Sequence, residues 1–235
     1  LSGRWRFFWG RYGNAGDVIL EKGDIFNIPT GIFRGFENIG KDYGMLMAIL
    51  GGDDAGGGVI WAPEVLKEAE NHGLVLSEKG KIYDTKIGQQ MPSNETLMKP
   101  LTEKELQNFP EYSTDEVVPK YVARYLDLYS LSKNNSAKVI GENGKIYDKP
   151  GFEVEFITEN SFENIKNTYD KDVVFMPVEG YWMLNSKNYN LILNPGDTFS
   201  LPKNNKFTLN PTKPGMATLY KVIPTNDIPG PTSRK

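Results

Sequence analysis

The sequence predicts an all-β protein in which two regions of short strands are separated by a helical connection. Apolar and polar residues alternate in segments such as 3–7 and 152–156, as they do in half-buried strands. Turn residues recur about every 8–12 residues between the short strands, a spacing typical of sandwiches and barrels. We therefore expect β structure over residues 1–59 and 137–223, a helical and loop connection over 60–136, and a tail over 224–235.

The first β region is expected to contain a series of short strands. Residues 3–7 alternate so that Trp5 and Phe7 share one face, and Arg4 and Arg6 share the other. Glycine-containing turns separate this strand from its successors. The further strands are expected at residues 17–20, 25–28, 34–38 and 44–50.

The connection carries signals for short helices. Ala62-Pro63-Glu64 places proline near a first helical turn, and Gly73 follows at the expected end of that helix. Thr102 and Ser113 each stand three residues before a glutamate, which is the capping-box pattern of a helix start. Pro119 is expected to keep the second of these capped helices short or kinked.

The strand pattern returns after about residue 136. Residues 152–156 alternate strictly, and Val173-Val174-Phe175-Met176 is an apolar run of the length of a buried strand. The further strands are expected at residues 181–184, 189–193, 198–201 and 217–222.

Composition and charge exclude several classes of protein. The chain has 235 residues, with 27 basic and 30 acidic side chains, no cysteine and one histidine. Disulfides, a thiol nucleophile and thiolate-ligated zinc are therefore excluded. The net charge of −3 provides no field that would attract nucleic acid or an anionic membrane, so neither is an expected partner. No apolar stretch has the length of a membrane span, the opening residues do not read as a signal peptide, and a cytoplasmic location is expected.

The two β regions contain the same pattern of glycine, tryptophan and proline. The first copy reads Gly3-x-Trp5-x-Phe7 and then Gly23-Asp24-x4-Pro29-x-Gly31-x2-Arg34-x3-Asn38. The second copy reads Gly180-x-Trp182-x-Leu184 and then Gly196-Asp197-x4-Pro202-x-Asn204-x2-Phe207-x3-Pro211. This pattern resembles the second sequence motif of the cupin family, in which Gly, Pro, Gly, His and Asn follow at these spacings. The resemblance implies two double-stranded β-helix (jelly-roll) barrels in tandem, a bicupin.

The same resemblance implies a metal site that neither copy preserves. Cupin metal sites use a His-x-His pair and a Glu from a first motif, together with the His of the second motif. Arg34 stands at that His position in the first copy and Phe207 stands there in the second, and residues 164–179 contain no histidine. We expect the second barrel to hold no metal and to be packed with aromatic side chains. A divalent transition metal in the first barrel is expected only if ligands exist upstream of Leu1.

The first copy of the pattern begins close to the first residue of the chain. A barrel that begins at Leu1 would lack its first strands and would leave Trp5, Phe7, Phe26 and Phe36 without a covering sheet. We therefore expect the chain to be a fragment, or to obtain the missing strands from elsewhere.

Arg34 is the leading candidate for ligand binding. At a period of two residues it shares a face with Phe36, and a guanidinium inside the barrel would hold a carboxylate or phosphate in bidentate fashion. Trp5, Phe7 and Phe36 are expected to line this ligand pocket. The alternative is that Arg34 pairs with an internal acid and that the aromatic residues are simply core.

Two other features are weaker candidates for chemistry. His72 stands at a predicted helix end, where a surface or capping role is expected. Asp53 and Asp54 lie in the glycine-rich segment 51–58, which we interpret as a connection leaving the barrel, although an acid pair there would suit a hard cation.

Two functions from different classes follow. The first is a bicupin that binds a small molecule, in which the metal sites within this chain are degenerate. The alternative is a metal-dependent cupin enzyme, such as a dioxygenase, isomerase or lyase acting on a small organic acid, whose metal ligands lie outside this chain. The resemblance also implies a homodimer, because family members often pair through strand exchange.

Overall fold

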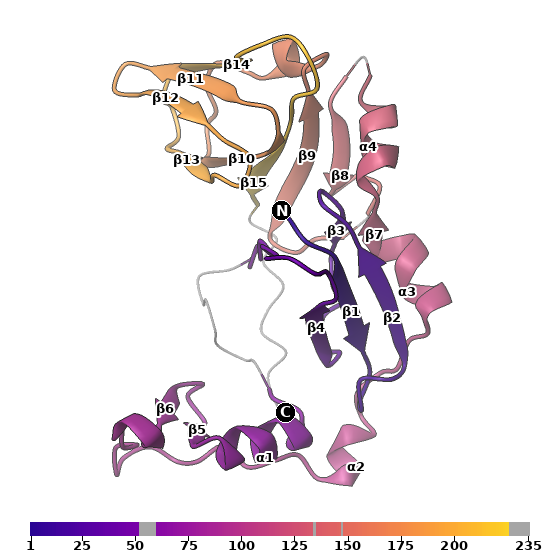
Figure 1. Cartoon of the computed structure of the whole chain (residues 1–235), viewed down its shortest axis with the longest axis vertical. Helices are drawn as coiled ribbons and strands as arrows, with labels where there is room; N and C mark the ends of the chain where they lie inside the picture. The colour runs from indigo at the N-terminus through magenta and orange to yellow at the C-terminus, as the bar shows by residue number, and fades with distance from the viewer. Residues whose placement is uncertain (52–59, 134, 147, 226–235) are drawn as a thin grey trace.

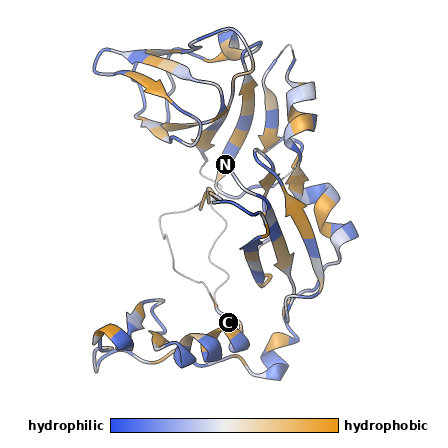
Figure 2. Cartoon of the chain, viewed as in Figure 1, coloured by the Kyte–Doolittle hydropathy of each residue, from blue (hydrophilic) through white to orange (hydrophobic). Residues whose placement is uncertain are grey.

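The computed structural model describes residues 1–51, 60–133, 135–146 and 148–225. The C-terminal β region lies at one end of the molecule, the N-terminal sheet lies in the middle, and a helical arm lies at the other end (Figure 1). Hydrophobic residues are concentrated on the strands of both β regions (Figure 2).

The C-terminal region consists of two antiparallel sheets. Its strands are β8 (Ala137–Ile140), β9 (Phe152–Thr158), β10 (Val173–Glu179), β11 (Trp182–Ser186), β12 (Asn190–Leu193), β13 (Phe199–Leu201), β14 (Phe207–Pro211) and β15 (Thr218–Pro224). The larger sheet has the order β13-β10-β15-β9-β8, and the smaller sheet has the order β12-β11-β14. The chain therefore passes repeatedly from one sheet to the other, which is the arrangement of a jelly roll.

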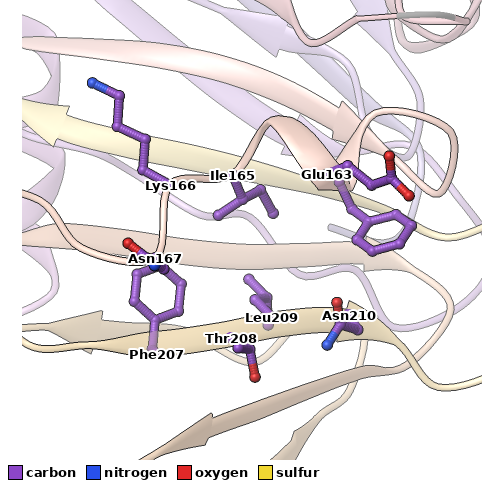
Figure 3. Close-up of a pocket in the computed structure, with 9 residues that line it drawn as sticks. Glu163, Ile165, Lys166, Asn167, Phe207, Thr208, Leu209 and Asn210 are labelled. Carbon is purple, nitrogen blue, oxygen red and sulfur yellow. The ribbon is translucent and has the colours of Figure 1, made fainter.

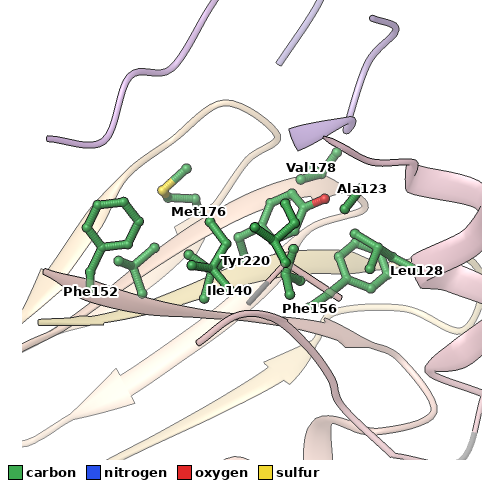
Figure 4. Close-up of a cluster of buried hydrophobic side chains, with 12 residues drawn as sticks. Ala123, Leu128, Ile140, Phe152, Phe156, Met176, Val178 and Tyr220 are labelled. Atoms are coloured by element: carbon green, nitrogen blue, oxygen red, sulfur yellow. The ribbon is translucent and has the colours of Figure 1, made fainter. Parts of the chain in front are cut away.

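The larger sheet is covered on both of its faces, which explains why its strands are so apolar. Its inner face carries residues such as Phe175 and Leu219, which pack against the smaller sheet. Its outer face carries Phe156 and Tyr220, which pack against elements of the connection (Figure 4). One sheet thus belongs to two hydrophobic clusters at once.

The N-terminal region is a three-stranded antiparallel sheet. It contains β1 (Trp5–Trp9), β2 (Gly16–Leu20) and β4 (Arg34–Asn38) in the order β2-β1-β4. The predicted strand at 25–28 is shorter than expected, because only β3 (Ile25–Phe26) pairs, and it pairs with β7 (Val122–Ala123) of the connection. The predicted strand at 44–50 is wrong. Only Met45 makes a bridge there, with Ser2, and no other described strand runs beside this segment.

The connection contains short helices and one hairpin. Its helices are α1 (Pro63–Asn71), η1 (Thr85–Ile87), α2 (Glu103–Leu106), α3 (Thr114–Tyr121) and α4 (Tyr125–Leu131), and η2 (Phe162–Asn164) lies in the second β region. Both predicted capping boxes are confirmed, at Thr102 and at Ser113. The similar segments 78–84 and 142–148 predict a repeated hairpin turn, and at the first of them β5 (Leu74–Leu76) and β6 (Ile82–Asp84) form a hairpin. Within the described ranges, no helix has both the length and the apolar character of a membrane span.

The connection joins the two β regions into one molecule. Val117 of α3 packs into the cluster of the N-terminal sheet, while Leu128 of α4 packs on the outer face of the larger C-terminal sheet. The Tyr220 hydroxyl crosses between the regions and donates to the Gly23 carbonyl at 2.5 Å. Lys22 and Glu179 add an ion pair of 2.6 Å between them.

The repeated sequence pattern folds in the same way twice. Gly3 and Gly180 both have positive φ angles, +83° and +66°, just before the tryptophan of each copy. The indole N–H of Trp5 donates to the carbonyl three residues earlier, at 2.9 Å, and the indole N–H of Trp182 does the same at 3.4 Å. The two strand starts therefore share one local structure.

The turn before the third strand is also repeated at atomic detail. Asp24 accepts a hydrogen bond through its carboxylate from the Glu21 N–H at 3.1 Å, and Asp197 accepts one from Asn194 at 2.7 Å. Further along, Gly31 has a φ of +79° and its counterpart, an asparagine, has a φ of +63°. Asparagine tolerates this left-handed conformation better than other side chains do, which is why it can replace the glycine.

Candidate functional site

The four predicted site residues lie on one face of the N-terminal sheet. Phe7 is directly opposite Phe36 in the pairing of β1 with β4, and Trp5 lies on the same side two residues along. The Phe36 ring is 6.0 Å from the Trp5 ring and 5.7 Å from the Phe7 ring, measured between centroids. Arg34 follows on this side, opposite Trp9. We call the side that carries Trp5, Phe7, Arg34 and Phe36 the aromatic face.

The inner end of the aromatic face is closed. The Phe26 ring lies 5.7 Å from Phe7 and 5.6 Å from Trp9, again between centroids. Trp9 is fully buried, and its indole N–H donates to the Tyr112 carbonyl at 2.7 Å. Val117 of α3 completes this cluster, so the connection rather than a second sheet covers this end.

The opposite side of the sheet is polar and holds the three strands together. Arg6 on β1 bonds Asp17 on β2 at 2.9 Å and Glu37 on β4 at 3.0 Å. These hydrogen bonds, to Asp17 first and to Glu37 second, raise the pKa of the Arg6 guanidinium. Because the pairs are exposed they stabilise little, but they fix the lateral positions of β2 and β4 beside β1.

Arg34 is exposed, and no acidic side chain pairs with it among the residues that the structure describes. In the part of the chain that the structure describes, its guanidinium makes no hydrogen bond and no ion pair. The alternative of pairing with an internal acid therefore finds no support among these residues. The preceding Phe33 packs on Phe109, with 4.9 Å between ring centroids, and this contact anchors the start of β4.

The predicted lack of a covering sheet applies to only part of the aromatic face. Phe36 is 58% exposed, as expected of an uncovered residue. Phe7 is only 9% exposed, because Phe26 and Phe36 cover it themselves. The expectation is therefore wrong for Phe7, and the open part of the face lies around Phe36 and Arg34.

The equivalent position in the second copy has a different environment. Phe207 occupies the expected histidine position and is 3% exposed, with its ring 5.5 Å from Phe175 and 6.0 Å from Tyr169. This confirms the prediction that aromatic side chains fill the second barrel. A hollow of about 290 Å³ lies beside it, between residues 162–167 and β14 (Figure 3).

Sequence reasoning missed a charged pair inside the second barrel. Lys221 of β15 is 6% exposed and forms an ion pair with Glu155 of β9. Its ammonium also lies 5.2 Å from the centre of the Tyr169 ring, a cation–π contact. The available signal was the alternation of β15, which places Lys221 on the inner face together with Leu219.

The residues at the motif positions do not suit the metal that the resemblance implies. A guanidinium has only donors and a phenyl ring has no lone pair, so neither Arg34 nor Phe207 can be a metal ligand. No three His, Asp or Glu side chains among the described residues come together in a way that would hold a metal ion. His72 is the C-cap of α1, with its Nε2 2.9 Å from Glu68, while Asp53 and Asp54 lie outside the described residues.

The comparisons with known proteins give structural neighbours only. No family model and no curated protein matches the chain. A cupin-2 domain protein of Shewanella frigidimarina aligns at 15% identity over 44% of this chain and 94% of its own, with a TM-score of 0.34. The putative ethanolamine utilization protein EutQ of Salmonella typhimurium aligns at 17% identity over 38% and 67%, with a TM-score of 0.29. The DMSP lyase DddQ of Ruegeria pomeroyi aligns at 9% identity over 44% and 55%, with a TM-score of 0.33.

The strand order identifies the fold. The strands β8 to β15 are shared between two facing sheets, the chain crosses between these sheets repeatedly, and the motif turn at Gly196-Asp197 lies between β12 and β13. These strands form a jelly roll. The N-terminal region repeats the part of this jelly roll that runs from β11 to β14, with the same strand order in its sheet. The predicted all-β fold class is confirmed.

Proposed function

We propose that this cupin-type jelly-roll protein binds a small molecule that carries a carboxylate next to an apolar ring, and that it does so on the aromatic face. Arg34 binds the carboxylate with two parallel N–H donors, the arrangement for which a guanidinium is best suited. The exposed ring of Phe36 supports the apolar part of the ligand, with Trp5 and Phe7 beside it.

The observation that carries the proposal is the guanidinium of Arg34, which has no hydrogen-bond or ion-pair partner among the described residues, beside the exposed ring of Phe36. Two residues apart on one strand face, the two side chains leave the sheet about 7 Å from each other. That spacing fits a ligand whose ring and carboxylate are directly bonded, as in a benzoate. Most other charged residues of this sheet, such as Arg4 and Arg6, already have ion-pair partners on the opposite side.

The test measures binding of 4-fluorobenzoate by fluorine NMR line broadening. We expect Arg34→Ala to weaken binding about 10- to 100-fold, as loss of a hydrogen bond to a charged group does. Arg34→Lys should bind with intermediate affinity, because an ammonium cannot make the bidentate contact. The uncharged 4-fluorobenzyl alcohol should bind the native chain no better than it binds Arg34→Ala.

The matched control is Arg4→Ala, which removes an exposed arginine from the other side of the sheet, where Arg4 pairs with Glu21 at 3.0 Å. This variant should bind 4-fluorobenzoate like the native chain. Circular dichroism confirms that each variant is folded. Equal affinities of the native chain and Arg34→Ala would overturn the proposal.

A further inference from the structure

The strand β14 forms one edge of the smaller sheet and pairs with little of the chain beyond that edge. Among the described residues, the only backbone hydrogen bond that it makes there is from the Phe207 N–H to the Asn167 carbonyl, at 3.0 Å. Residues 162–167 run alongside β14 in the opposite direction, and the hollow of about 290 Å³ separates the two segments (Figure 3). No described residue that lines it belongs to the five-stranded sheet, so the hollow lies at the sheet edge and not between the sheets.

Leu209 directs its backbone toward this hollow. In an antiparallel sheet, alternate residues of an edge strand bond the neighbouring strand, and the Thr212 N–H bonds the Tyr181 carbonyl before β11 at 2.9 Å. Every second residue of β14 counted back from Thr212 therefore bonds β11, whereas Leu209 faces outward. No described group bonds its N–H or its carbonyl, although the residue is only 4% exposed. Buried backbone groups without partners are costly, so this edge is suited to a ligand that supplies both hydrogen bonds.

The hollow is apolar along one wall and charged at its two ends. Phe162 and Ile165 pack against the cluster that contains Leu209. Lys166 lies at the end where β14 begins, and Glu163 lies toward the end where β14 finishes (Figure 3). Both charged side chains are exposed, and neither forms an ion pair within the described ranges. The hollow therefore offers a cation at one end, an anion at the other and an apolar wall between them.

We propose that this hollow binds a short peptide in extended conformation, antiparallel to β14, with an apolar residue opposite Leu209. In an antiparallel pair of this kind, the two facing residues exchange both of their backbone hydrogen bonds, which satisfies Leu209. Facing side chains lie on the same side of a sheet, so the apolar side chain of the peptide meets Phe162 and Ile165. This site is separate from the aromatic face and does not depend on the function proposed for it.

The two charges set the direction and the length of the peptide. A peptide antiparallel to β14 has its amino terminus beside Glu163 and its carboxylate beside Lys166. The part of β14 that lines the hollow runs from Phe207 to Asn210, which is about 10 Å at the usual rise per residue of a strand. An extended tripeptide has this length. The ligand class is therefore a free tripeptide whose central residue is apolar.

NMR titration of the 235-residue chain with Gly-Leu-Gly tests the binding. We expect saturable shifts of the Leu209 amide and of the Ile165 methyl signals, with a dissociation constant of about 1 mM or below. Gly-Gly-Gly lacks the apolar side chain and should bind about tenfold more weakly. Gly-Leu-Gly with an N-methyl group on the leucine keeps the side chain and both charges but loses the central N–H. It should also bind about tenfold more weakly, because it cannot donate to the Leu209 carbonyl.

The orientation is tested by removing one charge at a time. Lys166→Ala should weaken binding of Gly-Leu-Gly about two- to fivefold, as loss of an exposed ion pair does. Gly-Leu-Gly amide, which has no carboxylate, should bind Lys166→Ala and the native chain equally. The matched control is Lys145→Ala, which removes an exposed lysine of the same β region that does not line the hollow. This variant should bind Gly-Leu-Gly like the native chain.

Three results would overturn the proposal. The first is the absence of a saturable shift of the Leu209 amide up to about 10 mM Gly-Leu-Gly. The second is equal affinity for Gly-Leu-Gly and for its N-methylated form, which would show that the peptide does not pair with β14. The third is equal affinity of the native chain and Lys166→Ala for Gly-Leu-Gly, which would show that the hollow does not recognise a free tripeptide by its carboxylate.

Discussion

At the scale of single residues, Arg34 and Phe207 show how one position can serve two purposes. They occupy the same place in the two copies, each at the start of its strand. Phe207 is buried among other rings and fills a barrel, whereas Arg34 is exposed. Burying an arginine without a partner costs several kcal/mol, so the charged residue is tolerated in the copy whose face is open.

Tyr220 makes a single buried hydrogen bond between the two β regions. Its hydroxyl donates to the Gly23 carbonyl at 2.5 Å, and the residue is 4% exposed. Tyr220→Phe should lower the free energy of unfolding by about 1–2 kcal/mol, because the buried Gly23 carbonyl loses this hydrogen bond. Urea denaturation at neutral pH measures this. An unchanged midpoint would show that water replaces the hydroxyl.

The same tyrosine predicts a dependence of stability on alkaline pH. Burial raises the pKa of Tyr220 well above its usual value of 10.0. In the unfolded chain the phenol ionises near pH 10, while in the folded chain it stays protonated. The free energy of unfolding should therefore decrease as pH rises above about 10, and should decrease less in Tyr220→Phe. Parallel pH profiles for the two proteins would contradict this.

Residue-level expectations from the sequence succeeded where spacing determines backbone geometry. The match between Gly31 and Asn204 was visible in the spacing, and both adopt the left-handed conformation. The buried pair of Lys221 and Glu155 was not predicted, because its two members are far apart in the sequence and meet only when β9 and β15 pair. Side-chain partners of that kind depend on strand register, which a single sequence does not specify.

At the scale of elements, pairing partners decided which predicted strands formed. The strands that alternate and have neighbours, such as 34–38 and 152–156, are present. Residues 44–50 are apolar enough for a buried strand, yet no described strand lies beside them except at the bridge of Met45 to Ser2. The hairpin turn between β5 and β6 was predicted from the repeat of residues 78–84 at 142–148, but its two strands were not, because three residues each are too few to show a period.

The start of α3 provides a pH-dependent test at this scale. Glu116 accepts from the Ser113 N–H at 2.8 Å, and this backbone hydrogen bond is the main reason that the pKa of its carboxyl is lowered. A lowered pKa means that the carboxylate stabilises the fold at pH values above about 4.5 and that this contribution disappears as pH falls through the folded-state pKa. Glu116→Gln should therefore melt at a lower temperature than the native chain at neutral pH, and at the same temperature near pH 3.

The readout for α3 can be local as well as global. The indole N–H of Trp9 donates to the Tyr112 carbonyl just before this helix, so the assigned NMR signal of this N–H group reports fraying there. Asp115→Asn is the control, because it removes a neighbouring carboxylate that takes no part in the capping box. If both variants shift the melting temperature equally at neutral pH, the effect is one of net charge and the capping account is wrong.

At the scale of the whole molecule, two copies of one four-strand unit differ in what covers them. The second copy is closed by a five-stranded sheet and packed with aromatic side chains. The first copy is closed at one end by α3 and Phe26 and is open around Phe36 and Arg34. This asymmetry assigns structural support to one copy and, in our proposal, carboxylate binding to the other.

The sequence pattern predicted that the unit is repeated, but it did not predict which elements cover each of the two copies. The common spacing of Gly, Trp and Pro identified both copies, because these residues are needed for local backbone conformations that both copies share. The packing of α3 and β7 on the first copy depends on contacts between residues about 100 positions apart in the sequence. The pairing of Ile25 with Ala123 is one of them. Contacts at that separation leave no short-range signal in the sequence.

The most direct test of the account is to determine where a ligand binds. A crystal structure of the chain with 4-bromobenzoate locates the ring by the anomalous scattering of bromine. We predict a carboxylate about 3 Å from the guanidinium nitrogens of Arg34, with the ring against Phe36. Bromine in the hollow beside Phe207, or anywhere away from Arg34, would contradict the account.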